Sequence, residues 1–246
     1  MDLNFSFLPK YWPMFVNGAK TTLLLSLATI LIGVVVGVFL AILRLSKWYP
    51  LKYLERFGLR RAARFNPLSF LSAFYVEFIR GTPLMVQIFF IFYALPQMGL
   101  RFPNITGLGF DFPRFASGIL ALGLNSGAYI AEIVRAGIQA VDRGQTEAAR
   151  SLGMTGGQAM RHIVLPQAFK NILPALGNEF VTLIKESSIV MVIGITELMF
   201  NTSQVYSSSY RYFESLIVCA VIYFVMTFTT SRLMGLVERR LRADER

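Results

Sequence analysis

Residues 145–166 read QTEAARSLGMTGGQAMRHIVLP, a polar stretch that lies between two long apolar runs. Within it, residues 147–152 predict a short helix, and Gly153 is expected to end that helix in a left-handed conformation. Thr155 is a good N-cap for a second short helix over residues 156–164. Two short helices joined by one glycine form a rigid knob, which transmits an applied displacement as a body.

The residues around the two helices support the same interpretation. Asp142 to Thr146 predicts a turn before the first helix, and the small side chains of Ala148 and Ala149 provide a close-packing face. Pro166 is expected to end or bend the second helix before the next apolar run begins.

The composition on both sides of the knob indicates a membrane protein. Of the 246 residues, 54% are apolar and 15% are charged, whereas a soluble domain is about one quarter charged. Uncharged apolar runs cover 21–43, 81–100, 115–131 and 215–231, and a fifth run, 171–197, is interrupted by Glu179, Lys185 and Glu186. A hydrocarbon core of ~30 Å needs ~20 helical residues, so each run predicts one span with help from its flanks.

We therefore predict an all-α integral membrane protein that forms a single domain over residues 1–246. Its five transmembrane helices are expected at approximately 15–44, 70–98, 114–138, 171–198 and 211–236, with the knob in a loop over 142–170. Within the second span, Thr82 and Pro83 are expected to cap and restart the helix after Gly81.

The sequence offers little for chemistry of its own. Cys219 is the one cysteine and His162 the one histidine, which excludes a disulfide framework and a metal site rich in cysteine or histidine. There is no candidate catalytic residue and no complete phosphate-binding loop. The energy for any active process is therefore expected from a partner.

The distribution of basic residues predicts the orientation. Lysine and arginine crowd the segments 44–64, 135–170 and 232–246, whereas 101–114 and 202–211 are nearly bare. Because basic loops stay in the cytoplasm, the N-terminus is expected outside and the C-terminus inside. The basic loops are expected to set this topology and to touch anionic headgroups.

The spacing within the knob carries a family resemblance. Glu147-Ala148-Ala149 is followed by three residues, Gly153, nine residues and Ile163-Val164-Leu165-Pro166, which is the complete EAA pattern. The chain thus resembles the permease subunits of ATP-binding-cassette importers with the type I fold. The stretches RGTP at 80–83, NSGAYIAE at 125–132 and KESS at 185–188 make it similar to the polar amino acid uptake family, of the histidine, glutamine and glutamate permease type.

The resemblance implies a function and a set of partners. The knob would dock in a groove of a cytoplasmic ATP-binding subunit through the coupling residues Glu147, Ala148, Ala149, Gly153, Ile163, Leu165 and Pro166. Two permease subunits, identical or homologous, would pair in the bacterial inner membrane, with an ATPase dimer below and an extracytoplasmic substrate-binding protein above. The partner would bind ATP, so this chain would need no cofactor, would not be an enzyme, and would carry polar amino acids by alternating access.

Polar residues inside the spans indicate where such a substrate passes. Asn125 and Glu132 share one helical face, as do Thr182 and Glu186. An amino acid brings a carboxylate, which needs donors, and an ammonium, which Glu186 can hold. The candidate passage residues are Gln87, Asn125, Ser126, Glu186 and Ser188. The alternative role for most of them is hydrogen bonding between helices, worth ~0.6–2 kcal/mol per contact.

Other functions stay open at this point. The knob alone would also fit an amphipathic helix on the headgroups, although the match at every fixed position of the pattern disfavours it. An ion-gradient-driven secondary transporter or channel subunit is the main alternative, but such transporters commonly contain internal repeats, and these five unequal spans show none. A membrane enzyme would need a nucleophile with a base, or a metal cluster. The sequence leaves open which amino acid is carried and whether the permease pair is a homodimer or a heterodimer.

Overall fold

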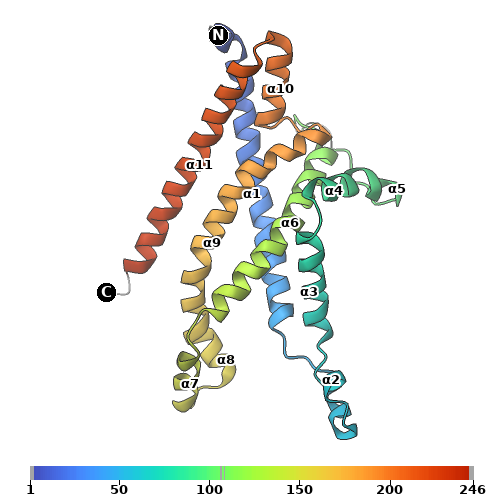
Figure 1. The fold of residues 1–246 in the computed structure, drawn as a ribbon, viewed down its shortest axis with the longest axis vertical. Helices are drawn as coiled ribbons and strands as arrows, with labels where there is room; N and C mark the ends of the chain where they lie inside the picture. The colour runs from blue at the N-terminus through green and yellow to red at the C-terminus, as the bar shows by residue number, and fades with distance from the viewer. Residues whose placement is uncertain (1–2, 106, 108, 244–246) are drawn as a thin grey trace. The chain divides into compact units, whose positions relative to one another are not determined.

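The structure is a computed structural model that describes residues 3–105, 107 and 109–243. Every regular element in these ranges is helical (Figure 1). In chain order the elements are α1 (Leu8–Leu45), η1 (Lys52–Phe57), α2 (Arg60–Ala63), α3 (Pro67–Arg80), α4 (Leu84–Phe89), η2 (Phe90–Ala94), α5 (Leu95–Gln97), α6 (Phe112–Gln139), α7 (Arg143–Ser151), α8 (Gly156–Ala159), η3 (Met160–Val164), α9 (Leu165–Glu186), η4 (Ser187–Ile193), α10 (Leu198–Ser209) and α11 (Tyr212–Ala243). Among the short elements, η1 and η4 are 3-10 helices, whereas η2 and η3 are π-helical.

Within the described ranges, three helices are long and apolar enough to cross a membrane, namely α1, α6 and α11. α3 and the α4–α5 segment pass the same test of length and apolar composition only when they are counted together, either as one broken span or as a re-entrant loop. The predicted fourth span corresponds to α9, whose 22 residues include the charged residues Lys170, Glu179, Lys185 and Glu186. The all-α membrane fold predicted from the sequence is confirmed.

The second predicted span contains a break. α3 ends with Gly81 as its C-cap, and α4 restarts after Pro83, so the predicted restart is confirmed. The predicted Thr82 cap is wrong, because the Thr82 hydroxyl donates backwards to the carbonyl of Phe78 at 3.0 Å. Pro83 occupies the N-cap position without a side-chain hydrogen bond, and the fixed ring of proline keeps α3 from continuing.

Two further segments differ from the prediction. The segment 202–211, expected to be a loop, is largely the helix α10. The range 171–198, expected to be one helix, changes to the 3-10 helix η4 at Ser187, whose hydroxyl donates to the carbonyl of Ile184 at 2.8 Å. Gly194 then ends η4 with a φ of +80°. A local hydrogen bond of this kind changes the helix type at a position that hydropathy does not indicate.

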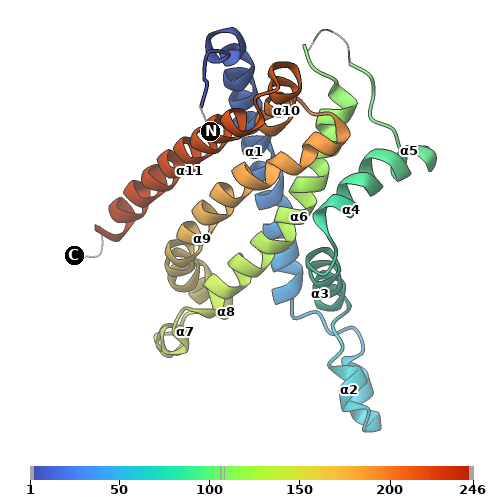
Figure 2. The same ribbon diagram turned by 45° about the horizontal axis from the view of Figure 1, so that its top comes forward.

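The helices divide into two compact units. The first contains residues 1–32, 83–123 and 177–246, and its main core lies between α1, α9, α10 and α11. Phe15, Ile184, Leu198, Val205 and Cys219 are buried in this core. α10 and α11 form a hairpin beside the first half of α1, as both ribbon views show (Figures 1 and 2).

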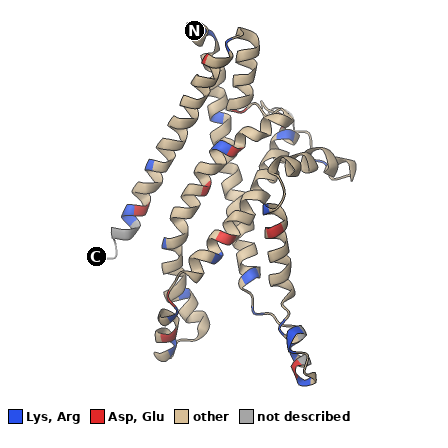
Figure 3. Ribbon diagram, in the orientation of Figure 1, with Lys and Arg blue, Asp and Glu red and all other residues tan. Residues whose placement is uncertain are grey.

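The second unit contains residues 33–82 and 124–176. Here α1, α3 and α6 pack through Leu40, Val76, Ala128 and Ala131. Glycines allow α1 and α6 to approach closely, because a Cβ on Gly37 would lie 2.6 Å from Cγ2 of Ile130. Charged residues of this unit are concentrated on the η1–α2 segment and around α7 (Figure 3).

Candidate functional site

The first helix of the knob, α7, begins at its own capping residue. The Asp142 carboxylate accepts a hydrogen bond from the backbone N–H of Gly144 at 2.6 Å. Aspartate is among the strongest N-caps, so the helix starts at Arg143. The predicted turn over Asp142 to Thr146 is therefore wrong beyond its first residue.

Gly153 ends α7 in the predicted left-handed conformation, with a φ of +87°. The N–H of Gly153 donates to the carbonyl of Arg150 at 3.0 Å, and the N–H of Met154 donates to the carbonyl of Ala149 at 3.1 Å. This pair of bonds is the Schellman motif, which satisfies the last carbonyls of a helix and requires a positive φ at the glycine. The predicted glycine stop is confirmed, and its role in coupling stays a prediction.

Thr155 starts the second helix as predicted. Its hydroxyl accepts from the N–H of Gln158 at 3.3 Å, and the Gln158 side-chain oxygen accepts from the N–H of Thr155 at 2.8 Å. This reciprocal capping box satisfies two backbone donors at once.

The second helix of the knob continues directly into the next span. α8, η3 and α9 run without interruption, so Pro166 does not end the helix as one form of the prediction held. The N–H of Leu165 donates to the carbonyl of Met160, five residues back, which widens the helix immediately before the proline. Proline lacks an N–H and crowds the preceding turn. The wider π-helical turn lets the helix continue through Pro166.

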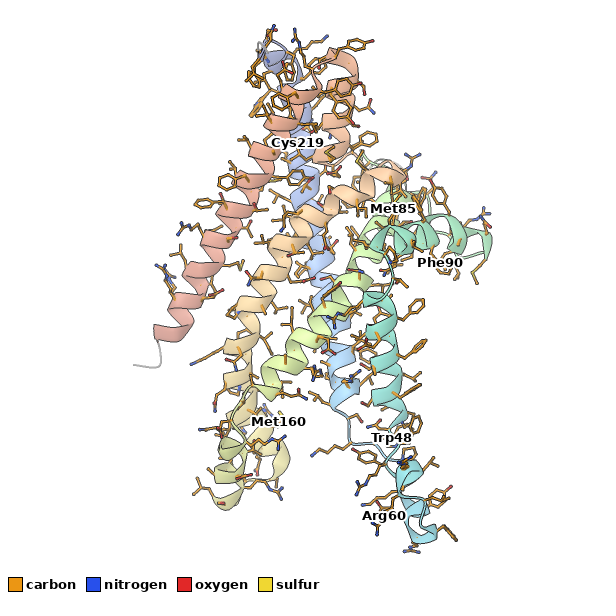
Figure 4. All side chains as sticks on the ribbon, in the orientation of Figure 1. Trp48, Arg60, Met85, Phe90, Met160 and Cys219 are labelled. Atoms are coloured by element: carbon orange, nitrogen blue, oxygen red, sulfur yellow. The ribbon has the colours of Figure 1, made fainter. Side chains whose placement is uncertain are left out.

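The predicted coupling residues face two directions. Ala149 is buried, and in the same unit Val141, Val164, Ala168 and Ile172 form a small core. The outward residues are Glu147, Ala148, Leu165 and Pro166, all exposed, whereas Ile163 is half-buried. Two apolar side chains of the knob are also exposed, Leu152 at 83% and Met160 at 39%. Figure 4 labels Met160 in the knob. The knob thus has one packed side and one unfilled apolar side.

A cavity of about 460 Å³ lies where the end of α6 meets the knob. It is lined by Ile138, Gln139, Val141, Arg143, Thr146, Met160 and Val164. Because α7 and η3 contribute lining residues, this cavity is a recess in the surface of the knob.

Two of the predicted passage residues, Asn125 and Ser126, are buried on α6. A Cβ on Gly33 of α1 would lie 3.1 Å from the Ser126 hydroxyl oxygen, so Ser126 sits in the close seam between α1 and α6. This position favours the interhelical role that the sequence left open for Ser126. A role in the passage stays a prediction for both residues.

The other three predicted passage residues lie in the first unit. Gln87 is buried on α4, and Ser188 is half-buried on η4. Ser188 lines a cavity of about 480 Å³ together with Lys185, Met199, Leu216, Cys219, Ala220 and Tyr223. Glu186, the last residue of α9, is exposed on the single chain. A carboxylate exposed within a span must meet water, a substrate or a second subunit, because lipid would not solvate it.

Charged and aromatic side chains meet at the C-terminal half of α6. Arg135 forms an ion pair with Glu132 at 2.6 Å and donates to Gln139 at 2.6 Å. The guanidinium of Arg80 lies over the ring of Tyr129, 5.2 Å from its centroid. Such stacking and pairing hold arginine side chains in fixed positions within the second unit.

Sequence reasoning missed Glu197, which is fully buried. Its carboxylate accepts from the N–H groups of Met199 and Phe200, at 2.8 and 2.6 Å, and from the Tyr223 hydroxyl at 2.9 Å. The N–H of Leu198 donates to the Thr22 hydroxyl at 3.1 Å. Glu197 therefore caps α10 and ties it to α11, directly beside α1. The signal in the sequence was an acidic residue immediately before a polar helical stretch.

Comparisons with known proteins identify a matching family and several similar proteins. The family model described as binding-protein-dependent transport system inner membrane component matches residues 57–243. The arginine transport system permease protein ArtQ of Bacillus subtilis (strain 168) is 37% identical over 245 residues, which cover 100% of both chains. The probable glutamine ABC transporter permease protein GlnM of the same strain is 38% identical, over 97% of this chain and 98% of that protein. A crystal structure of an amino acid ABC transporter with histidines has a TM-score of 0.81 at 46% identity, covering 98% of this chain and 100% of the other.

Proposed function

The chain belongs to the family of binding-protein-dependent transport system inner membrane components, and from this premise we propose that it carries polar amino acids inward. It is a multi-pass permease subunit of an ATP-binding-cassette importer and not an enzyme. Relatives named for arginine and glutamine, and a structural neighbour described with histidines, support an amino acid as the cargo. This assignment disfavours the alternative of an ion-gradient-driven transporter.

The construction of the knob carries the proposal. Both of its helices are capped by their own side chains, and the second helix is continuous with α9. A push on α8 is therefore delivered to α9 without a flexible joint, and a push on α7 reaches α8 through the Schellman turn at Gly153. A loop that only joined two spans would need neither the Schellman turn at Gly153 nor the capping box.

The proposed cycle uses this rigidity. Two permease subunits pair in the membrane, and each knob docks in a groove of one cytoplasmic ATPase subunit. ATP, held entirely by those subunits, closes the ATPase dimer and draws the two knobs together. The spans then open outward, where an extracytoplasmic binding protein releases its amino acid, and hydrolysis returns the passage to the inward-facing state.

The test is uptake by vesicles that contain this chain, its ATPase subunit and its binding protein. Radiolabelled arginine, glutamine and histidine are offered separately. We expect uptake of at least one of them to require ATP on the cytoplasmic side and to persist with an uncoupler. Uptake that survives ATP depletion but collapses with an uncoupler would instead establish the ion-gradient alternative.

Reporter fusions test the proposed orientation, with the N-terminus outside and the C-terminus in the cytoplasm. A reporter placed after Arg246 or near Arg56 is expected to be cytoplasmic, because both positions lie in strongly basic segments. A reporter near Gly107 is expected to be periplasmic. An alkaline phosphatase and a fluorescent protein at each site give opposite signals, and any inversion among the three sites contradicts the topology.

Glu186→Gln tests the proposed passage, because it keeps the size of the side chain and removes its charge. If Glu186 holds the substrate ammonium, the apparent affinity falls about tenfold, the loss expected for one charge-assisted hydrogen bond. Substrate-stimulated ATPase activity of the assembled complex measures this, and thermal stability in detergent is expected to be unchanged.

Glu238→Gln on α11 is the matched control, since it makes the same substitution at a residue outside the proposed passage. It should leave the apparent affinity near that of the parent. Unchanged affinity with lost stability in Glu186→Gln would show that the carboxylate pairs with a fixed cation between subunits. Glu186 would then not be part of the substrate passage.

A further inference from the structure

Hydrogen bonds at both ends fix the segment between α1 and α3 to the end of the first span. The Asn66 side-chain amide donates to the carbonyl of Ser46 at 2.6 Å, and the Ser69 hydroxyl donates to the carbonyl of Arg44 at 3.1 Å. Asn66 also caps α3 by accepting from the N–H of Ser69 at 3.1 Å. Residues 47–65 are therefore held, at both ends, beside the last turn of a membrane span.

This segment, which we call the basic foot loop (residues 47–65), is strongly cationic. Its basic residues are Lys47, Lys52, Arg56, Arg60, Arg61 and Arg64, and Glu55 is its one acidic residue. Six positive charges and one negative charge leave a net charge of +5 on a short excursion. Clusters of four to eight basic residues directly after a span are typical of surfaces that bind anionic lipids.

Large apolar side chains are interleaved with these charges and stay uncovered. Trp48 is 52% exposed, Tyr53 60% and Phe57 75%, and Tyr49, Leu59 and Phe65 are exposed as well. Figure 4 labels Trp48 and Arg60 in this loop. The two helices of the loop, η1 and α2, contain only six and four residues, too few to bury such side chains. In water this would be an unfavourable apolar surface, whereas the headgroup zone accommodates aromatic rings and basic groups side by side.

We propose that the basic foot loop is a membrane-surface element that binds the headgroups of anionic phospholipids. Its aromatic rings enter the boundary between headgroups and acyl chains, and its lysines and arginines pair with the phosphates. Charge complementarity and the position directly after α1 favour lipid over an acidic protein surface. The cytoplasmic placement of the loop rests on the orientation proposed above, but the binding itself does not.

The chain offers a direct reporter, because it contains two tryptophans, Trp12 and Trp48. Trp12→Phe leaves Trp48 as the one indole, within the basic foot loop. The full chain is placed in lipid nanodiscs of phosphatidylcholine, with or without 30% phosphatidylglycerol, that also contain a trace of lipid with a nitroxide near its headgroup. Since both faces of a disc have the same lipids, the result does not depend on which way the chain is oriented.

We expect quenching of Trp48 to rise about twofold or more when phosphatidylglycerol is present, and the rise to be lost at high salt. A variant in which Lys52, Arg56, Arg60 and Arg61 become Gln should lose the rise. The matched control changes the same number of charges in the C-terminal tail, with Arg232, Arg239, Arg240 and Arg242 replaced by Gln, and should keep it. Native mass spectrometry of the same variants should show fewer retained phosphatidylglycerol molecules only in the loop variant.

Three outcomes would overturn the proposal. The first is equal quenching with and without phosphatidylglycerol, and the second is an equal loss in the loop and tail variants. The third is protection of Trp48 that arises only when the ATPase subunit is added, which would assign the surface to that protein.

Discussion

Gly153→Val is expected to reduce ATP-driven uptake at least tenfold while leaving the chain inserted in the membrane. Gly153 has a φ of +87°, and a Cβ there would meet no atom within 4 Å, so the cost is conformational and not steric. A non-glycine residue in this region costs about 1–2 kcal/mol, and a β-branched residue more. The Schellman hydrogen bonds that close the end of α7 would then be weakened, and the turn between α7 and α8 would lose its fixed shape. Uptake and transport-coupled ATP hydrolysis measure the loss.

Two further variants distinguish the effect of the backbone conformation at Gly153 from the effect of adding a larger side chain. Gly157→Val adds the same side chain at another glycine of the knob that has open space around it and an ordinary helical φ, so it should transport nearly normally. Gly153→Asn should recover much of the activity, because asparagine tolerates the left-handed conformation. Normal coupled transport in Gly153→Val, or equal losses in the two valine variants, would refute the assignment of the knob to ATPase coupling.

Glu197→Ala is expected to lower the free energy of unfolding by about 2–4 kcal/mol, the largest stability effect that we predict. The change removes the cap of α10 and leaves two backbone N–H groups and the Tyr223 hydroxyl without their acceptor inside the first unit. Denaturation of the detergent-solubilised chain by sodium dodecyl sulfate measures the effect. Glu238→Ala on α11 serves as the control, since Glu238 is not fully buried, and should stay within about 0.5 kcal/mol of the parent.

A double-mutant cycle tests the proposed cause. Tyr223→Phe removes only the hydroxyl and should cost less than Glu197→Ala. The double variant should be more stable than the sum of the two losses predicts, because both single changes break the same hydrogen bond. Strict additivity would mean that the Glu197–Tyr223 contact contributes nothing to stability.

Much of the knob was predictable from sequence because its stabilising interactions are local. Gly153 and Thr155 act through hydrogen bonds that reach no more than five residues along the chain, so residue type and spacing suffice to identify them. The start of α7 was misplaced because Asp142 fits a turn and an N-cap equally well. The expectation that Pro166 could end the helix was wrong because a π-helical turn has no reliable signature in one sequence.

The sequence by itself thus determined the membrane class, through composition, and the two-helix shape of the knob, through local hydrogen bonding. Only the tertiary structure decided which polar residues face neighbouring helices. Ser126 and Glu186 look alike as polar residues in a span, yet Ser126 is buried beside Gly33 and Glu186 is exposed. Glu197 likewise gained its importance from Tyr223, which is 26 residues away along the chain. Helical periodicity shows which residues share a face, but what that face meets depends on contacts between segments far apart in sequence.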